Sequence, residues 1–372
     1  MSKVSELIKK LCPNGVKFYQ IKDIAKVTIG EFVHKNKHSD DSPYPVYNGG
    51  TSNTGFYDEF NNDGHKVIIS ARGANAGFIN RVEGKYWAGN SCYTININDE
   101  SQLNWNYLYQ YLKNNQTILL GVQQTGSIPA ISKKQVEEFK IAIPPLEVQK
   151  EIVRILDKFG ELEAELEAEL EARKSQYEFW RGKLLNEDYE TKYLPELSTN
   201  LDNKRKPVTK SNRESGVYPY YGASGIVDYV SGYIFDDELL LVSEDGANLK
   251  ARSTPIAFSS SGKVWINNHA HVLKFNSMIT QKYVEHYLNM IDISEYITGA
   301  AQPKLNQENL NKIRINIPSS IEEQEKIVIA LERFDRLIND ISVGLPAEIE
   351  LRRKQYEYYR DKLLSFEEYA NE

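Results

Sequence analysis

The ten residues QYEFWRGKLL at positions 176–185 return as QYEYYRDKLL at positions 355–364, with seven of the ten positions unchanged. Further matches follow in the same order towards the N-terminus of each copy. IAIP at 141–144 returns as INIP at 315–318, and VIIS at 67–70 returns as LLVS at 240–243. The chain therefore contains a repeat of about 175 residues, which is too long for one unit of a solenoid. We interpret it as a domain followed by a helix, present twice.

The first part of each copy has the texture of a mixed domain. Short β-rich runs at 66–70 and 93–97 in copy one, and at 239–242 and 272–275 in copy two, lie between Gly, Asn and Pro turns. Helical stretches at 106–112 and 281–288 interrupt these runs. Each module is therefore predicted to be a mixed α/β (α+β) domain, and the two domains form a tandem duplication.

The second part of each copy is helical. Its apolar residues recur at steps of three and four, which predicts a coiled-coil seam. About 40 residues at 1.5 Å each would make a rod of ~60 Å. We predict two long antiparallel helices and four segments: 1–145, 146–189, 190–318 and 319–372. The predicted seam consists of Leu156, Phe159, Leu162, Leu166, Leu170, Tyr177, Leu331, Phe334, Ile338, Ile341, Tyr356 and Tyr359.

Two features qualify the helices. Pro346, beside Gly344, lacks an amide hydrogen and should kink or interrupt the second helix. The run LEAELEAELEA at 162–172 is a tandem repeat of four residues, and each unit lengthens a helix by ~6 Å.

Bulk properties limit the class of protein. With 372 residues, a hydrophobic fraction of 41% and two cysteines, the chain predicts a soluble, cytoplasmic protein of two or three domains without a disulfide framework. The net charge of −7 is uneven: residues 151–190 hold 6 Lys/Arg against 12 Asp/Glu, a balance of −6. Because that segment reads as a solvated helix, the net charge does not exclude a nucleic-acid partner.

Motifs for catalysis are missing. We find no GxxxxGK[ST] phosphate loop, no Gly-rich nucleotide fingerprint and no amino-methyltransferase tetrapeptide. Asp63 with Glu83 and Lys85 forms only a loose nuclease-like pattern, which copy two does not repeat. His269 and His271 have metal-compatible spacing, but the equivalent residues of copy one are not ligands. We predict no catalytic residue and no metal.

Polar residues of two shared loops are candidates for contact with DNA. Arg reads guanine and Asn or Gln reads adenine, while Lys holds phosphates. Each loop also has a simpler interpretation: a glycine turn at 70–77, and solvated residues in the second loop. The candidates in or beside these loops are Arg72, Asn75, Gln123, Gln124, Lys133, Lys134, Asn248, Lys250, Gln302 and Lys304, and the further candidates are Lys85 and Lys263.

Two similar modules joined by two long helices suit a long target that is read at two separated places. Duplex DNA is such a target, and because the modules differ in sequence, the two half-sites should differ. A non-enzymatic scaffold with two protein-binding modules is the alternative hypothesis.

The motifs IPPLEVQKEI at 143–152, LCPNGV at 11–16, and RKSQY and RKQY before the two repeated helix ends resemble those of type I restriction-modification specificity subunits. The resemblance covers essentially the whole chain, in order, twice. It implies two target-recognition domains that bind double-stranded DNA, and helical regions that dock methyltransferase subunits.

The same resemblance implies the partners and the cofactor. No cofactor is expected in this chain, whereas S-adenosylmethionine is expected in the methyltransferase subunit, which flips and methylates adenine at N6. A restriction subunit can join such complexes to cut unmodified DNA. No membrane partner is expected. The run at 162–172 resembles the spacer repeats of the family, and we hypothesise that the number of its units sets the half-site spacing.

Overall fold

The computed structural model describes residues 3–121, 129–299 and 301–369. Its contacts divide the chain into two compact units: Met1–Glu165 with Ile349–Glu372, and Leu166–Glu348. We call them unit 1 and unit 2. Both boundaries fall inside long helices, because each helix packs partly on the β-rich domain beside it. The bounds of the four segments that the sequence indicates therefore stay a prediction.

Unit 1 contains the first β-rich domain. Its elements are α1 (Lys3–Leu11), β1 (Phe18–Gln20), α2 (Ile21–Ile24), β2 (Ala25–Ile29), η1 (Lys35–Lys37), β3 (Tyr44–Tyr47), β4 (Phe56–Tyr57), β5 (Lys66–Ser70), β6 (Ile79–Val82), β7 (Trp87–Ala88), β8 (Cys92–Ile97), α3 (Trp105–Asn114), α4 (Gln116–Gly121), α5 (Lys133–Glu137) and β9 (Lys140–Ala142). The helix α6 (Leu146–Leu185) starts here and continues into unit 2.

Unit 2 contains the second domain. Its elements are β10 (Glu190–Tyr193), α7 (Leu194–Leu197), β11 (Ser198–Asn200), η2 (Asp202–Lys204), η3 (Lys210–Asn212), β12 (Ser215–Gly222), β13 (Gly225–Val230), β14 (Phe235–Asp236), β15 (Leu239–Ser243), α8 (Asn248–Ala251), β16 (Ala257–Ser260), β17 (Lys263–Ile266), β18 (Ala270–Phe275), α9 (Met278–Met290), η4 (Ser294–Tyr296), α10 (Gln307–Leu310), β19 (Arg314–Ile317) and α11 (Ile321–Asn339). The helix α12 (Leu345–Leu364) begins in unit 2 and continues into unit 1.

The main sheets repeat strand by strand, which confirms the duplication. The main antiparallel sheets have the orders β2-β8-β5-β6 and β11-β18-β15-β16. The smaller sheets are β4-β3-β7 and β13-β12-β17-β14, and each contains one parallel pair. That pair has the same register in both, since Val46 lies opposite Trp87 and Tyr220 lies opposite Trp265. The predicted strands and helices at 66–70, 93–97, 239–242, 272–275, 106–112 and 281–288 are all present.

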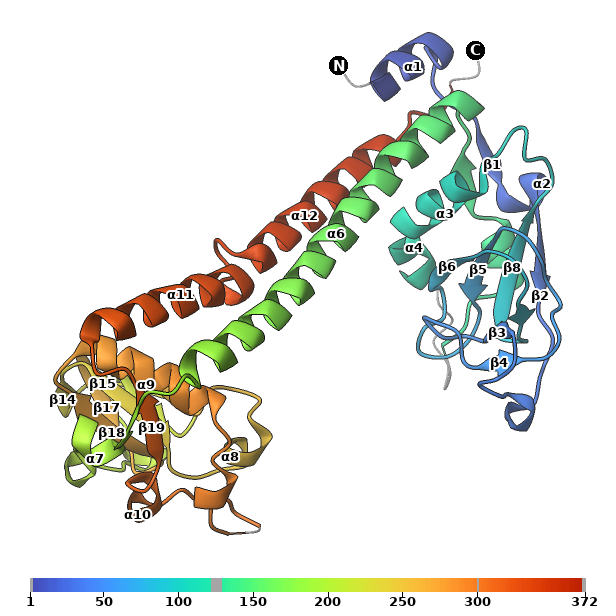
Figure 1. Ribbon diagram of the computed structural model, residues 1–372. Coiled ribbons are helices and arrows are strands. Elements are labelled where there is room, and N and C mark those ends of the chain that lie inside the picture. Colours follow the sequence, from blue (N-terminus) through green and yellow to red (C-terminus); the bar gives the residue numbers. More distant parts are fainter. Residues whose placement is uncertain (1–2, 122–128, 300, 370–372) are drawn as a thin grey trace. The chain divides into compact units, whose positions relative to one another are not determined.

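Each main sheet is covered by one helix on one face and by the smaller sheet on the other. The central strands β5 and β15 are apolar and almost wholly buried, as expected for strands covered on both faces. The helix α3 packs on β5 and β6, and α9 packs on β16 and β18 (Figure 1). A buried tyrosine on each helix ties it to the closing strand: the Tyr107 hydroxyl donates to the Ala142 carbonyl at 2.8 Å, and the Tyr283 hydroxyl donates to the Asn316 carbonyl at 2.9 Å.

A buried glutamine joins each domain to the helix that follows it. The Gln149 side chain is fully buried; its amide donates to the carbonyls of Pro144 (2.7 Å) and Gln102 (2.8 Å). Its oxygen accepts from the Asn104 amide at 2.8 Å. Gln324 repeats this arrangement by donating to the Pro318 carbonyl at 2.7 Å. Because each proline ends a domain, the glutamine fixes the direction in which the helix begins.

The long helices pair within each unit. In unit 1 the first half of α6 lies along α12: the Phe159 ring is 5.6 Å from that of Tyr359, and Glu163 forms an ion pair with Arg353 at 2.6 Å. These pairs run in opposite order along the two helices, so the pairing is antiparallel. In unit 2 the second half of α6 meets α11, where Tyr177 packs 6.4 Å from Phe334. Leu156, Tyr177, Leu331 and Ile338 are buried on these seams, while Phe159, Leu162, Leu166, Leu170, Phe334 and Tyr356 are half-buried.

The second helical region is broken, and the break lies earlier than predicted. The helix α11 ends at Asn339, and the Gly344 amide donates to the Asp340 carbonyl at 2.9 Å to close a turn. A side chain at Gly344 would meet the Arg336 carbonyl, so this position requires glycine. Pro346 falls in the first turn of α12, where its missing amide hydrogen costs nothing. The prediction of Ile341 on the seam was wrong, because Ile341 lies in the break and is 85% exposed.

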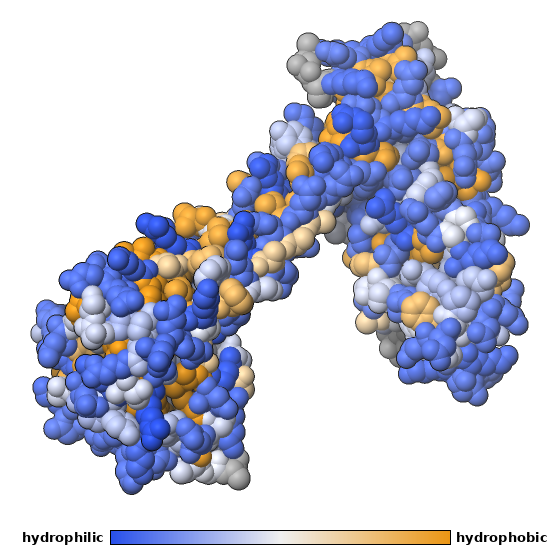
Figure 2. Space-filling model, in the orientation of Figure 1, coloured by the Kyte–Doolittle hydropathy of each residue, from blue (hydrophilic) through white to orange (hydrophobic). Residues whose placement is uncertain are grey.

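The visible face of each unit is mainly hydrophilic (Figure 2). Among the described helices, none combines the length and apolarity that a membrane span requires.

We predict that Gln149→Leu lowers the free energy of unfolding of unit 1 by about 2–3 kcal/mol, because buried backbone groups lose their partners. Urea denaturation followed by hydrogen exchange should place the loss in unit 1. Gln176→Leu, at an exposed position of α6, is the control. Equal stability of the two variants would contradict the anchoring role of Gln149.

Candidate nucleic-acid interface

The two shared loops meet in domain 1. After β5, the Gly73 amide donates to the Pro129 carbonyl at 2.9 Å, and the Ile131 amide donates to the Ala71 carbonyl at 2.9 Å. Gly73 has a φ of 92°, a conformation that glycine adopts without steric cost. The loop that follows β5 is therefore held against the segment that precedes α5.

Domain 2 builds the same pair of loops. The Gly246 amide donates to the Pro303 carbonyl at 3.1 Å, and the Leu305 amide donates to the Glu244 carbonyl at 2.8 Å. Gly246 also has a positive φ, of 109°. Segments that are more than 50 residues apart in the sequence thus form one paired surface in each domain. We call these two surfaces the paired loops: residues 71–77 with 129–131, and residues 244–248 with 302–305.

The candidates of domain 1 do not all lie together. Arg72 and Asn75 are exposed on the paired loops. Lys133 and Lys134 lie on α5 just beyond them, and they form ion pairs with Glu137 (3.3 Å) and Glu138 (3.8 Å). Lys85 lies elsewhere, with its ammonium group 4.4 Å from the centre of the Phe60 ring. Gln123 and Gln124 lie outside the described residues.

In domain 2, Asn248 has a structural task. Its amide donates to the Thr254 carbonyl at 2.9 Å, and its oxygen accepts from the Thr254 amide and the Ser253 hydroxyl at 3.1 Å each. The side chain thus closes the turn after α8. These contacts occupy both its amide group and its oxygen, which reading a base would also require. Exposed candidates are Lys250 on α8 and Gln302 on the paired loops. Lys263 lies on β17, over the Tyr233 ring at 4.8 Å.

A buried charge network stands behind the paired loops of domain 2. Arg205 contacts Glu244 at 2.5 Å and Asp202 at 3.4 Å, with 13% of its side chain exposed. His271 lies 2.6 Å from Asp202, and Lys304 forms an ion pair with Glu244 at 3.2 Å. The candidate Lys304 is therefore tied to a buried carboxylate. Domain 1 has no counterpart of this carboxylate, because Ala71 occupies the position of Glu244.

The network holds both carboxyls ionised. Burial by itself would raise the pKa of Asp202 and of Glu244, but their partners outweigh it and both pKa values are lowered. Hydrogen bonding and charge from His271 act on Asp202, and Arg205 with His271 acts on Glu244.

Three of these residues also have the composition of a metal site. Within the described part of the chain, Asp202, Glu244 and His271 form the one cluster whose potential ligand atoms lie within 4.8 Å of one another. Arg205 and Lys304 already supply positive charge to the two carboxylates. A divalent cation would have to displace both partners, so the donor set fits an internal ion network better than a metal centre.

Sequence analysis missed a basic segment beside this network. Residues 204–213 contain five Lys or Arg and no Asp or Glu. Lys204, Lys206 and Lys210 are exposed on it. The run of cations is visible in the sequence, but it lies outside the two repeated loops.

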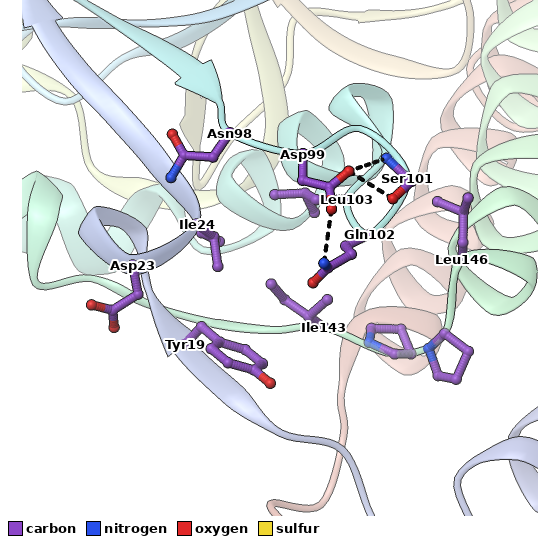
Figure 3. A pocket seen from close by; sticks show the side chains of 12 residues that line it. Tyr19, Asp23, Ile24, Asn98, Asp99, Ser101, Gln102, Leu103, Ile143 and Leu146 are labelled. Atoms are coloured by element: carbon purple, nitrogen blue, oxygen red, sulfur yellow. Dashed lines mark hydrogen bonds between the residues drawn. The ribbon is translucent and has the colours of Figure 1, made fainter.

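A cavity of about 590 Å³ lies in unit 1 where β9 leads into α6 (Figure 3). Tyr19, Asp23 and Asp99 line it, together with Pro144 and Pro145. The Asp99 carboxylate accepts from the Ser101 backbone and hydroxyl and from the Gln102 amide, and these hydrogen bonds lower its pKa. None of the predicted DNA-binding residues lines this cavity.

The family model for the type I restriction modification DNA specificity domain matches residues 13–172 and 186–351. It thus matches twice, once over each copy of the repeat. The chain belongs to this family.

Individual type I specificity subunits are also similar to this chain in sequence. A putative type I restriction enzyme specificity subunit of Haemophilus influenzae is 38% identical over 200 residues, which are 52% of this chain and 51% of that protein. The match therefore spans about half of the Haemophilus protein. A putative type I specificity subunit of Mycoplasma pneumoniae is 26% identical over 369 residues, covering 94% of this chain and 98% of that protein.

Solved structures of specificity subunits share the fold. An S subunit of a type I restriction-modification system from M. genitalium aligns with a TM-score of 0.60 and 17% identity, over 94% of this chain and 96% of that one. An HsdS subunit from Thermoanaerobacter tengcongensis aligns with a TM-score of 0.55 and 14% identity, over 95% and 97%.

We predict that Arg205→Gln lowers the free energy of unfolding of unit 2 by about 3 kcal/mol at pH 7, because two buried carboxylates lose their main cation. A carboxyl with a lowered pKa stabilises the fold above its unfolded pKa of about 4, and this contribution disappears as the pH falls through the folded value. The deficit of the variant should therefore shrink between pH 5 and pH 3. Urea denaturation across this range measures it, with exposed Lys204→Gln as the control. A deficit that does not change with pH would contradict the network.

Proposed function

We propose that this chain is the DNA specificity subunit of a type I restriction-modification complex, in which each domain reads one half of an asymmetric bipartite target. The observation that carries the proposal is the pair of repeated loops, built on the same backbone hydrogen bonds in both domains but with different side chains. Where domain 1 has Arg72, domain 2 has Asp245, as their matching β-bridges to Ala130 and Lys304 indicate. An exposed arginine and an acidic residue select different base edges, so the two half-sites differ.

In this proposal the partner subunits catalyse the reactions. The chain contributes no catalytic residue; the methyltransferase subunits supply S-adenosylmethionine and methylate an adenine in each half-site at N6. A flipped base is the substrate of such enzymes, so the specificity subunit has only to hold the duplex in register. A restriction subunit that joins the complex would cut DNA lacking the modification.

The long helices dock the methyltransferase subunits and set the distance between the half-sites in this proposal. The helix α6 is continuous over 40 residues, and the run at 162–172 lies within it. Leu162, Leu166 and Leu170 are half-buried at intervals of four residues. Removing four residues preserves the four-residue repeat and shortens the helix by ~6 Å.

A scaffold that binds two proteins is the competing function. The single feature in its favour is that many exposed apolar side chains lie on the β12–β13 hairpin, among them Val217 and Val227. The duplicated specificity-domain match favours DNA. Loss of sequence-dependent, salt-sensitive binding to duplex DNA would support the scaffold.

We predict that co-expression with the methyltransferase subunit of its own system places N6-methyladenine in a single motif of two unlike short halves with a fixed gap. Modification-sensitive sequencing of a plasmid measures this. The methyltransferase subunit expressed alone is the control and should give no such motif. An assembled complex without new methylation would contradict the proposed function.

We predict that deleting residues 166–169 keeps both half-site sequences and shortens the gap by one or two base pairs, since DNA rises ~3.4 Å per step. The same methylation map measures it. Substituting the four residues by four alanines keeps the length and should keep the gap. An unchanged gap after the deletion would refute the spacer role.

A further inference from the structure

The basic segment 204–213 of domain 2 contains no α-helix or strand, and its backbone is held at several points between and beside the 3-10 turns η2 and η3. The Trp265 indole donates to the Lys206 carbonyl at 2.7 Å. The buried Tyr220 hydroxyl accepts from the Val208 amide at 2.9 Å and lies 3.3 Å from the Val208 carbonyl. A segment anchored in this way presents its outer side chains in a defined arrangement, which lowers the cost of ordering them on binding.

The two arginines of the segment are used as anchors. Arg205 enters the buried network of Asp202 and Glu244 and donates to the Ala270 carbonyl at 2.9 Å. Arg213 forms an ion pair with Asp228 at 3.1 Å, and its guanidinium lies 4.3 Å from the centre of the Tyr220 ring. Arginine suits this use because its planar group makes several directed contacts at once.

The three lysines of the segment do not anchor it. Lys204, Lys206 and Lys210 are exposed, and among the described residues their ammonium groups form no ion pair or side-chain hydrogen bond. The two nearest acids along the chain are already engaged, since Asp202 pairs with His271 and Glu214 accepts from the Ser231 hydroxyl at 3.0 Å. Asp228 pairs with Arg213, and the charge of Lys210 also acts on it. Like charges on a rigid segment repel one another, and an approaching polyanion relieves that repulsion.

Domain 1 contains the same turn with less positive charge. Its Trp87 indole donates to the Glu31 carbonyl at 2.8 Å, so Glu31 takes the place of Lys206. Counting from these residues, Lys35 takes the place of Lys210, and each begins a 3-10 turn. Residues 29–38 contain two Lys and one Glu, and Asp40 and Asp41 follow. The two domains therefore share the scaffold of the turn but differ in its charge.

We propose that the segment 204–213 binds the phosphate backbone of duplex DNA through Lys204, Lys206 and Lys210, and that the equivalent turn of domain 1 makes no such contact. The inference rests on the proposed function and adds to it a contact surface outside the paired loops. Lysine holds phosphate as a point charge, and such contacts set affinity and register but carry no base information.

The test compares Lys206→Gln/Lys210→Gln with Lys35→Gln/Lys37→Gln, which removes the same number of charges from the equivalent turn. Each variant is purified as the full chain in complex with its methyltransferase subunit. Binding to a labelled 40-base-pair duplex of random sequence is followed by anisotropy between about 50 and 300 mM KCl. Each phosphate contact contributes ~0.9 to the slope of log K against log salt.

We expect the domain 2 variant to lose about 1.8 from this slope and to bind at least tenfold more weakly at 0.15 M salt. The domain 1 variant should bind like the unmodified complex, and thermal melting should be the same for all three. The methylation motif should be unchanged in both variants, because phosphate contacts are not specific for sequence.

Equal slopes for the two variants would overturn this inference and leave the proposed function intact. A normal slope with loss of the methyltransferase subunit on purification would also overturn it, since the lysines would then serve an acidic protein surface. If the complex without substitutions binds no duplex, this result contradicts the proposed function itself.

Discussion

The fold depends most on the hydrogen bonds that join each domain to its helix. A helix on one chain segment and a sheet on another stay in a defined orientation only if the backbone groups at their junction are satisfied. Gln149 and Gln324 do this from the first turn of α6 and α11, by donating to the carbonyls of Pro144 and Pro318. Both amides are buried, so water cannot replace them as partners. Each glutamine therefore fixes the direction in which a helix leaves its own domain.

Duplication also allows each copy to be specialised without a change of scaffold. The loop hydrogen bonds of Gly73 and Gly246 are made by backbone atoms, and the residues beside them are free to change. Domain 2 has a buried ion network on Glu244 at the position where domain 1 has Ala71. The tryptophan-tied turns show the same principle, since they keep an indole hydrogen bond but differ in charge. Backbone contacts preserve the frame, and side chains carry what differs between the two domains.

Net charge is a poor guide to the partner of this protein. The chain as a whole carries −7, and much of the acidity belongs to the exposed face of α6. In that helix, acidic residues pair with basic neighbours three or four positions away, as Glu169 does with Arg173 at 2.7 Å. Residues 204–213 hold five Lys or Arg and no Asp or Glu, so they form a local cluster of positive charge. Local excess of charge, fixed on an anchored segment, decides what a surface attracts at short range.

The sequence by itself determined the duplication, the mixed class of the domains, the central strands and the helical character of both linkers. Repetition and apolar periodicity carry this information because they reflect burial, which each stretch of chain requires locally. Tertiary structure decided the rest. It placed Asn248 in a turn, Lys304 on a buried carboxylate and Ile341 in the break between α11 and α12. These outcomes depend on partners far away in the sequence, such as Glu244 for Lys304, and no local pattern specifies which distant group a polar side chain will meet.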